Sequence, residues 1–144
     1  MRAVIDTNVL VSAMVNPHGT PARVIAAVLA GACTPLLDDR LVDEYRSVLL
    51  RPKFRFDKRD VEALIAALVT VGEYVLVRPL AVELPDPDDL PVLEVAVSAG
   101  ADAVVTGNVR HFRAAARDLN VPLWSPAEMV ARLVPHMPVP RAGR

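Results

Sequence analysis

The sequence predicts an α/β protein: a single domain of three layers, in which a mostly parallel central sheet of four to five strands carries helices on both faces. Apolar runs of four or five residues alternate along the chain with longer amphipathic segments. This alternation is typical of buried parallel strands joined by helices. The length of 144 residues suits one domain, and no internal repeat or low-complexity segment divides the chain.

The first half of the chain is expected to form three strands and four helices. The strands are expected at 2–6, 33–37 and 74–77, and the helices at 9–15, 20–31, 39–51 and 57–72. Each strand is a short apolar or β-branched run, and each helix follows residue types that commonly cap helix starts. The capping residues expected for the first three helices are Thr7 or Asn8, Thr20, and Asp38 or Asp39.

A turn-rich stretch at 79–91 leads into the second half. Helices are expected there at 90–99, 110–119 and 126–134, and strands at 103–106 and 121–124. The pattern Ser125-Pro-Ala-Glu128 is a capping box with proline at the first helical position. We expect the folded domain to span 1–134 and the proline-containing tail, 135–144, to be flexible.

Composition limits the functional classes. Apolar residues make up 53% of the chain and mean hydropathy is +0.33, from which we expect a filled aliphatic core and a homodimer interface. The apolar runs fall short of the roughly 18 residues that span a membrane, and no signal peptide is visible. The single cysteine, Cys33, fits a buried core position and a reducing cytoplasm. The net charge of −1 means that any nucleic-acid contact must be local.

Two predicted strands end in polar residues. Asp6 ends the first strand, and Thr106, Gly107 and Asn108 follow the strand at 103–106. Ligands of parallel sheets bind at the carboxyl ends of the strands. Asp6 therefore has two possible roles from its position: a ligand-binding carboxylate, or the N-cap of the next helix.

Glu44 lies on or beside the apolar stripe of the third predicted helix. It shares a helix face with Leu41 and Tyr45 by the i, i+3, i+4 rule. A carboxylate there is costly unless it is paired or binds a cation. The alternative is an ion pair with Arg40 or Arg51.

The segment Asp86-Pro-Asp88-Asp89 is the densest acidic cluster. Helix capping and the helix dipole account for two of its three carboxylates. Acids this close repel one another unless a cation or a base relieves them. Mg²⁺ is typically held by one or two carboxylates with water and substrate phosphate, and Asp6, Glu44 and Asp89 together could build such a site.

These motifs resemble those of PIN domains, in a branch of toxin components of toxin–antitoxin systems. The resemblance covers about residues 1–130. It rests on residues 4–10 as the opening motif, Glu44 ahead of 51–54, Asp86–Asp89 followed by Leu93 and Ala96, and 105–108 with His111 and Phe112. It implies a ribonuclease that cleaves single-stranded RNA with Mg²⁺ or Mn²⁺, and an antitoxin protein as partner.

Carried over by position, the resemblance implies Asp6, Glu44 and Asp89 as the metal-binding acids. Asp88 remains the rival of Asp89, because the cluster allows a shift of one residue. Asn108 departs from the Asp that many PIN domains have there; its carbonyl oxygen can coordinate a metal but brings no charge, which puts a second metal in doubt. Thr106 would orient a carboxylate or water. The metal would activate a water for in-line attack on the phosphodiester, and no covalent intermediate is needed.

Basic residues collect in two places. One group lies within 46–59 and the other within 110–117, and the residues expected to contact RNA are Arg46, Arg51, Lys53 and Arg110. Phe54 and Phe56 interleave the first group. They either stack on an unpaired base or, as we favour, face the core.

Two other functions remain open. A phosphatase with a strand-end Asp nucleophile typically has Asp-x-Asp, whereas Asn8 stands at the second position here. A catalytically silent PIN-like module that binds RNA or protein is the second alternative, and Asn108 is the residue that favours it.

Overall fold

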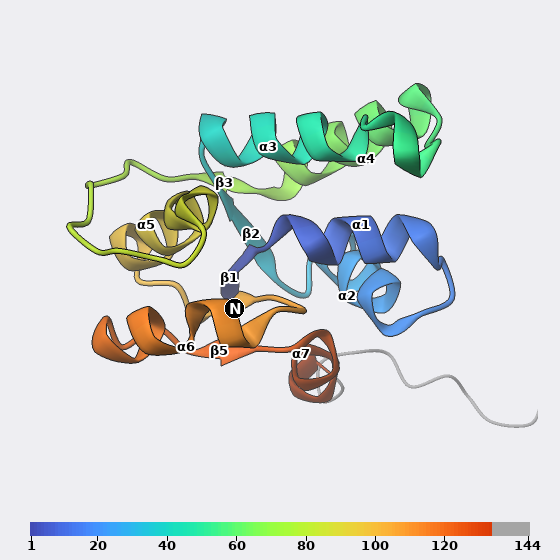
Figure 1. Ribbon diagram of the computed structural model, residues 1–144. Helices are drawn as coiled ribbons and strands as arrows, with labels where there is room; N and C mark the ends of the chain where they lie inside the picture. Colours follow the sequence, from blue (N-terminus) through green and yellow to red (C-terminus); the bar gives the residue numbers. More distant parts are fainter. Residues whose placement is uncertain (134–144) are drawn as a thin grey trace, which may run out of the picture.

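A five-stranded parallel sheet forms the centre of the molecule, which the computed structural model describes for residues 1–133 (Figure 1). Its strands are β1 (Arg2–Ile5), β2 (Thr34–Leu37), β3 (Glu73–Tyr74), β4 (Ala103–Val105) and β5 (Leu123–Trp124). They lie in the order β3-β2-β1-β4-β5, and each neighbouring pair is parallel. The predicted α/β class and parallel sheet are confirmed. The tail at 135–144 and the end of the predicted domain at 134 lie outside the described residues.

Helices cover both faces of the sheet. They are α1 (Thr7–Val15), α2 (Thr20–Leu29), α3 (Asp39–Leu49), α4 (Lys58–Val71), α5 (Leu90–Ala99), α6 (Val109–Asp118) and α7 (Pro126–Leu133), with short 3₁₀ turns η1 (Pro52–Phe54) and η2 (Pro87–Asp89). Helix α5 packs against β1, β2 and β4, while α4 packs against β2 and contacts α2, which contacts α7. Figure 1 shows α5 on one side of the strands and α2 on the other. Within residues 1–133, none of the helices has both the length and the apolar character to cross a membrane.

The sheet order changes direction at β1. The chain leaves β1 to build β2 on one side, whereas β4 lies on the other side. Ligands of open α/β sheets bind at such a switch point, outside the carboxyl ends of the strands. Ile5 is paired with Val105, so the residues that follow them, Asp6 and Thr106, are neighbours.

Two of the predicted helix caps are wrong. Helix α1 begins at Thr7, and Asp6 occupies its N-cap position, because the Asp6 carbonyl already accepts a hydrogen bond from Val9 N at 3.0 Å. The Asn8 side chain is therefore inside the helix and does not cap it. Helix α2 begins at Thr20, so its N-cap is the preceding Gly19.

Two other caps are confirmed. Asp38 Oδ1 accepts a hydrogen bond from Leu41 N at 2.9 Å at the start of α3. Ser125 Oγ accepts from Glu128 N at 3.1 Å, and Glu128 Oε1 accepts from Ser125 N at 3.4 Å. The predicted capping box of α7 is thus present in both directions.

The third strand is shorter than the predicted 74–77. Only Glu73 and Tyr74 pair with β2, opposite Leu36 and Leu37. Because β2 ends at Leu37, the residues after Tyr74 have no neighbouring strand to pair with. One backbone hydrogen bond continues past the strand, from Val75 N to Leu37 O at 2.8 Å.

The core is aliphatic, as the composition predicted. Its largest fully buried side chains include Tyr45 and Phe112 among many leucines. Cys33 is buried in the same core, and burial raises the pKa of its thiol to about 11. The thiol is therefore a packing group at neutral pH.

Candidate metal centre

Asp6 is a buried carboxylate whose side chain is held by the neighbouring strand. Its Oδ2 accepts a hydrogen bond from Thr106 Oγ1 at 2.7 Å, and its side chain makes no capping bond to α1. Burial raises the pKa of Asp6, and the Thr106 hydrogen bond opposes that rise. The simple capping role is therefore excluded for the Asp6 side chain, which points toward β4.

Glu44 reaches the same region from α3. The helix is fixed to the end of β1 by Tyr45, whose hydroxyl donates to the Ile5 carbonyl. Glu44 is half-buried, and its pKa is raised by burial and by the charges of Asp6 and Asp89. Within residues 1–133 it makes no ion pair, because Arg40 binds other carboxylates, so the alternative of pairing with Arg40 or Arg51 is not realised.

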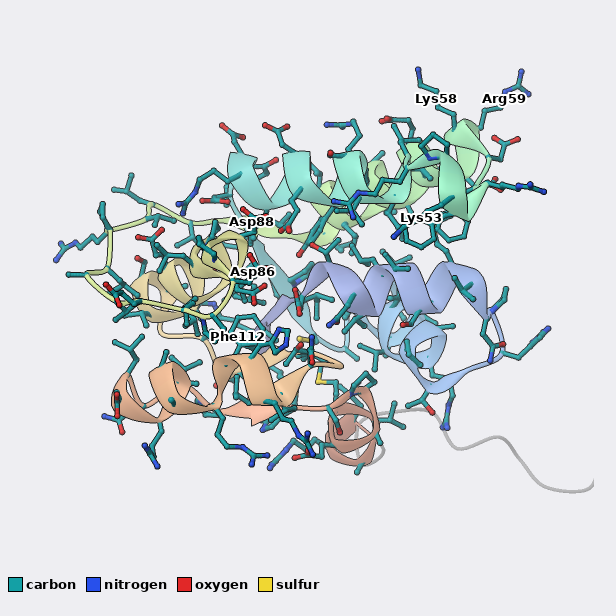
Figure 2. The ribbon with its side chains drawn as sticks, viewed as in Figure 1. Lys53, Lys58, Arg59, Asp86, Asp88 and Phe112 are labelled. Atoms are coloured by element: carbon teal, nitrogen blue, oxygen red, sulfur yellow. The ribbon has the colours of Figure 1, made fainter. Side chains whose placement is uncertain are left out.

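The acidic cluster before α5 divides into different roles. Asp86 Oδ1 accepts from Asp88 N at 2.9 Å and caps η2, while Asp88 is exposed. Asp89 is half-buried, and its pKa is raised to about 6 by burial and by the charges of Asp6 and Asp86. Figure 2 shows Asp86 and Asp88 beside the start of α5. Asp89 is the member of this cluster whose pKa is clearly raised, and the charge of Asp6 contributes to that rise.

A polar network surrounds the Thr106 hydroxyl. Asn108 N donates to Thr106 Oγ1 at 2.9 Å, and Asn8 Nδ2 lies 3.4 Å from it. Asn8 Oδ1 also accepts from Gly107 N at 3.1 Å. Thr106 is fully buried and joins Asp6 to the loop that carries Asn108.

His111 is a site residue that the sequence analysis did not select. Its Nδ1 lies 3.1 Å from Asn108 Nδ2 and 3.9 Å from Asp89 Oδ2. Its spacing of three residues from Asn108, on one helix face, was the signal that could have identified it. His111 brings a nitrogen group to the position that faces Asp89.

The gathered residues fit a hard cation by their chemistry. Asp6, Glu44 and Asp89 offer carboxylate oxygens, the ligand type that Mg²⁺ and Mn²⁺ prefer. Thr7 Oγ1 is buried beside Asp6, and the Thr7 side chain lowers the pKa of the Glu44 carboxylate. In residues 1–133, no three His, Cys, Asp or Glu side chains are grouped as a ready-made metal site. The carboxylates would therefore have to close around an ion.

The basic residues differ in how available they are. Arg46 is paired with Glu62 at 3.0 Å and lies 3.8 Å from Asp43, which weakens its prediction as an RNA contact. Arg51, Lys53 and Arg110 are exposed. Figure 2 shows Lys53, Lys58 and Arg59 toward the far end of the α3–α4 pair from Asp86 and Asp88.

The two phenylalanines of the first basic group stack on each other. Their ring centroids are 5.4 Å apart, with Lys53 Nζ 5.0 Å from the Phe54 ring. Phe56 packs against the core, and both rings are half-buried. The preferred core-facing interpretation is correct for Phe56.

Comparisons with known proteins agree with this architecture. A family model described as the PIN domain matches residues 2–110. A solved structure of VapBC2 from Rickettsia felis, bound to a DNA fragment from their promoter, includes a chain with a similar fold: the TM-score is 0.57 and the identity 15%, over 87% of this chain and 98% of that chain. No curated protein matches the sequence.

Proposed function

The chain belongs to the PIN domain family, and on that premise we propose that it is a divalent-metal-dependent endoribonuclease acting on single-stranded RNA. One observation carries the proposal. Asp6 stands at the carboxyl end of β1, and its charge raises the pKa of Glu44 and of Asp89, two carboxylates from distant segments of the chain. Like charges gathered in this way favour a bound cation.

In the proposed mechanism, Asp6 and Asp89 would hold Mg²⁺ or Mn²⁺, and Glu44 would position the ion or its water. When bound, the cation lowers the pKa of a coordinated water and offsets the phosphate charge. The protein holds the donors in place: Thr106 fixes one Asp6 oxygen through its hydroxyl. Asp89 is preferred to Asp88 as the third acid because it is less exposed.

Asn108 contributes a neutral amide next to His111. It supplies no charge for a second cation, so we propose a site that holds one ion well. Asn108 would contact the RNA or the water network of Thr106.

RNA would approach along α6, which begins at the site. Arg110, Arg113 and Arg117 are exposed on this helix and share its outer side by their spacing. Arg117 has one weak partner, Asp118, at 4.0 Å. A row of arginines is suited to phosphate contacts, and Arg51 and Lys53 form a second, more distant group.

We further propose that the protein is a cytoplasmic toxin, with an antitoxin protein as partner, and that it forms a homodimer. The fold similarity to a chain of the VapBC2 structure supports the partner. The exposed apolar side chains of Tyr74 and Leu76, two residues apart at the edge strand β3, support an interface. The single buried thiol, Cys33, fits a reducing compartment, and the nuclease domain would span 1–134.

The test is Mn²⁺-dependent cleavage of a single-stranded RNA by the purified chain and by the Asp6→Asn variant. Asp43→Asn is the matched control, because Asp43 is exposed on α3 next to Glu44 and faces away from the site. We expect cleavage by the native chain and the control and at least a hundredfold loss in Asp6→Asn. If Asp6→Asn cleaves as well as the native chain in a clean preparation, the assignment of Asp6 is wrong.

A second candidate, a silent PIN-like module that binds RNA or protein, is favoured by Asn108 alone. Calorimetry separates the two. A nuclease should bind Mn²⁺ more tightly than its Asp6→Ala variant, whereas a silent module should bind the ion no better.

A further inference from the structure

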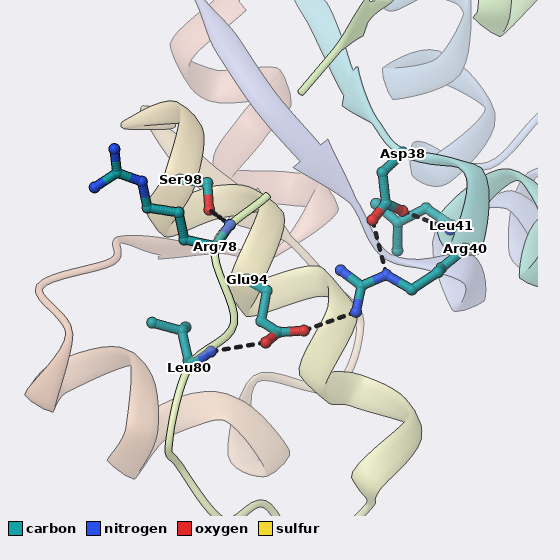
Figure 3. Close-up of polar contacts among 7 residues, drawn as sticks. All are labelled: Asp38, Arg40, Leu41, Arg78, Leu80, Glu94 and Ser98. Carbon is teal, nitrogen blue, oxygen red and sulfur yellow. Dashed lines mark hydrogen bonds and ion pairs between the residues drawn. The ribbon is translucent and has the colours of Figure 1, made fainter. Parts of the chain in front are cut away.

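Glu94 is a buried carboxylate in the middle of α5, apart from the proposed metal-binding acids. The residue is 4% exposed, yet both of its carboxylate oxygens are satisfied. Oε1 accepts from Arg40 Nη1 at 2.7 Å, and Oε2 accepts from Leu80 N at 2.7 Å (Figure 3). A charge buried this deeply persists only when it is paired and hydrogen-bonded.

Arg40 connects Glu94 to the start of α3. Its Nε donates to Asp38 Oδ2 at 2.8 Å, and the other oxygen of Asp38 caps the helix through Leu41 N. Figure 3 shows the chain of contacts from the Asp38 cap through Arg40 to Glu94. The first turn of α3 is therefore attached to the middle of α5 by charged groups.

The same carboxylate anchors the connection that leads to the acidic cluster. Leu80 N binds Glu94, and two residues earlier Arg78 N donates to Ser98 Oγ on the next turn of α5 at 2.9 Å. These bonds fix the course of the chain ahead of Asp86. The helix that carries Glu44 and the connection that leads to Asp89 are thus both bonded to α5 at or near Glu94.

The spacing relates this junction to the site. Glu44 lies four residues after Arg40, about 6 Å along α3 on the same face. Asp89 is the N-cap of α5, five residues before Glu94. The Arg40–Glu94 pair therefore joins the helix that carries Glu44 to the helix that begins after Asp89, and the charges of these two acids repel each other.

Stability alone does not account for a charged pair here. Well-packed apolar residues commonly replace buried ion pairs without loss of stability. An arginine that is hydrogen-bonded to two carboxylates has directional contacts, which an apolar contact lacks. Such a pair fixes the orientation of α3 and its position along α5. Asp6, by contrast, is held independently by Thr106.

We propose that Arg40 and Glu94 are positioning residues, which set the separation of Glu44 and Asp89 and hold these two acids facing Asp6. The inference rests on the proposed function only in naming these acids as cation ligands. Neither Arg40 nor Glu94 is expected to touch the cation or the RNA.

The test compares Mn²⁺ affinity, by calorimetry, in the native chain and in Arg40→Gln and Glu94→Gln. Partners that orient metal ligands typically change metal affinity ten- to a hundredfold when removed, so we expect each variant to bind Mn²⁺ at least ten times more weakly. Arg40→Lys keeps the charge and should restore most of the affinity. Measurements are made well below the melting temperature of each variant.

Glu62→Gln is the matched control. This change breaks the ion pair between Glu62 and Arg46 at 3.0 Å, which attaches α3 to α4 and not to α5. We expect Mn²⁺ affinity within twofold of the native chain. If Glu62→Gln weakens binding as much as Glu94→Gln does, the effect is general loosening of α3 and the proposal is overturned.

Amide spectra of the metal-free chain separate this proposal from the proposed function. In ¹H–¹⁵N spectra, Arg40→Gln and Glu94→Gln should each shift the amide signals of both Glu44 and Asp89. The control Glu62→Gln should not shift both of these signals. Absence of Mn²⁺ binding by the native chain would count against the metal site, while the spectra would still decide the positioning role. Unchanged Glu44 and Asp89 amides in both variants would refute it.

Discussion

Asp89→Asn should stabilise the metal-free protein at neutral pH. The carboxyl is crowded by Asp6 and Asp86, and burial together with these charges raises its pKa from 3.8 to about 6. A raised acid pKa means that the folded state holds the proton more tightly than the unfolded state does. The ionised Asp89 carboxylate therefore destabilises the folded state. This effect is absent below the pKa of the unfolded state, grows as pH rises from 3.8, and is complete above about 6.

The size of this destabilisation follows from the difference between the two pKa values, 3.8 and about 6. One pH unit corresponds to about 1.4 kcal/mol, so an unscreened carboxyl would cost about 3 kcal/mol above pH 6. Asp89 is partly exposed, and solvent screening reduces this figure. We therefore expect Asp89→Asn to raise the free energy of unfolding by about 1.5 kcal/mol at pH 7.5, and by about half as much at pH 5.

Urea denaturation in EDTA at the two pH values measures this difference. Asp88→Asn is the control, because Asp88 is exposed and its charge makes the smallest contribution to the raised pKa of Asp89; its effect should stay within about 0.5 kcal/mol. Saturating Mn²⁺ should reverse the order, since the ion stabilises the native chain by mass action and the variant less. A variant that is less stable than the native chain at pH 7.5 without metal would refute the crowding argument.

Three further outcomes are expected. Thr106→Val removes the 2.7 Å bond to Asp6 and should cost about 1.5–3 kcal/mol in urea denaturation at pH 7.5, as for a hydrogen bond to a charged group; Thr106→Ser should keep most of it, and a neutral Thr106→Val would contradict the assigned bond. Gly72→Ala should cost about 1–3 kcal/mol by the same assay, because an added Cβ would lie 2.6 Å from Leu37 Cδ1 and 2.7 Å from the Leu68 carbonyl oxygen; unchanged stability would show that α4 moves freely there. Arg113→Ala with Arg117→Ala should weaken RNA binding and reduce its salt dependence, measured by fluorescence anisotropy across a salt series; an unchanged salt slope would remove α6 from the proposed RNA path.

The sheet could be predicted because its strands are buried on both faces. Apolar runs such as 103–106 leave little choice of structure when helices flank them. The ends of the strands depend on the neighbouring strands with which they pair, and a local sequence pattern carries no information about these neighbours. The predicted strand at 74–77 shortened to Glu73–Tyr74 because β2 ends at Leu37.

The choice of cap was also decided by distant contacts. Asp38 caps α3 as its residue type suggests. Asp6 stands at a cap position, but its carboxylate is bonded to Thr106, one hundred positions away in the chain. The sequence placed Asp6 at a strand end, and the neighbouring strand decided how its oxygens are used.

Glu94 was missed for the opposite reason. It lies in a run of apolar residues, from Val92 to Ala96, in which every position is buried. A single charge in such a run was the available signal, since a buried carboxylate requires a partner. The partner, Arg40, is 54 residues away and had been considered only for Glu44.

These contacts together explain how a repulsive cluster can persist in a stable fold. Asp6, Glu44 and Asp89 disfavour one another's charged state, so without restraint the segments that carry them would move apart. Thr106 restrains Asp6, Tyr45 ties α3 to the end of β1, and Arg40 ties α3 to α5. Thr106 binds one carboxylate oxygen of Asp6 and leaves the other, whereas the other two restraints act on groups next to Glu44 and Asp89. We therefore expect a bound divalent ion to stabilise the folded state more than the neutralisation of any one acid does, because the ion reduces the repulsion among all three charges at once.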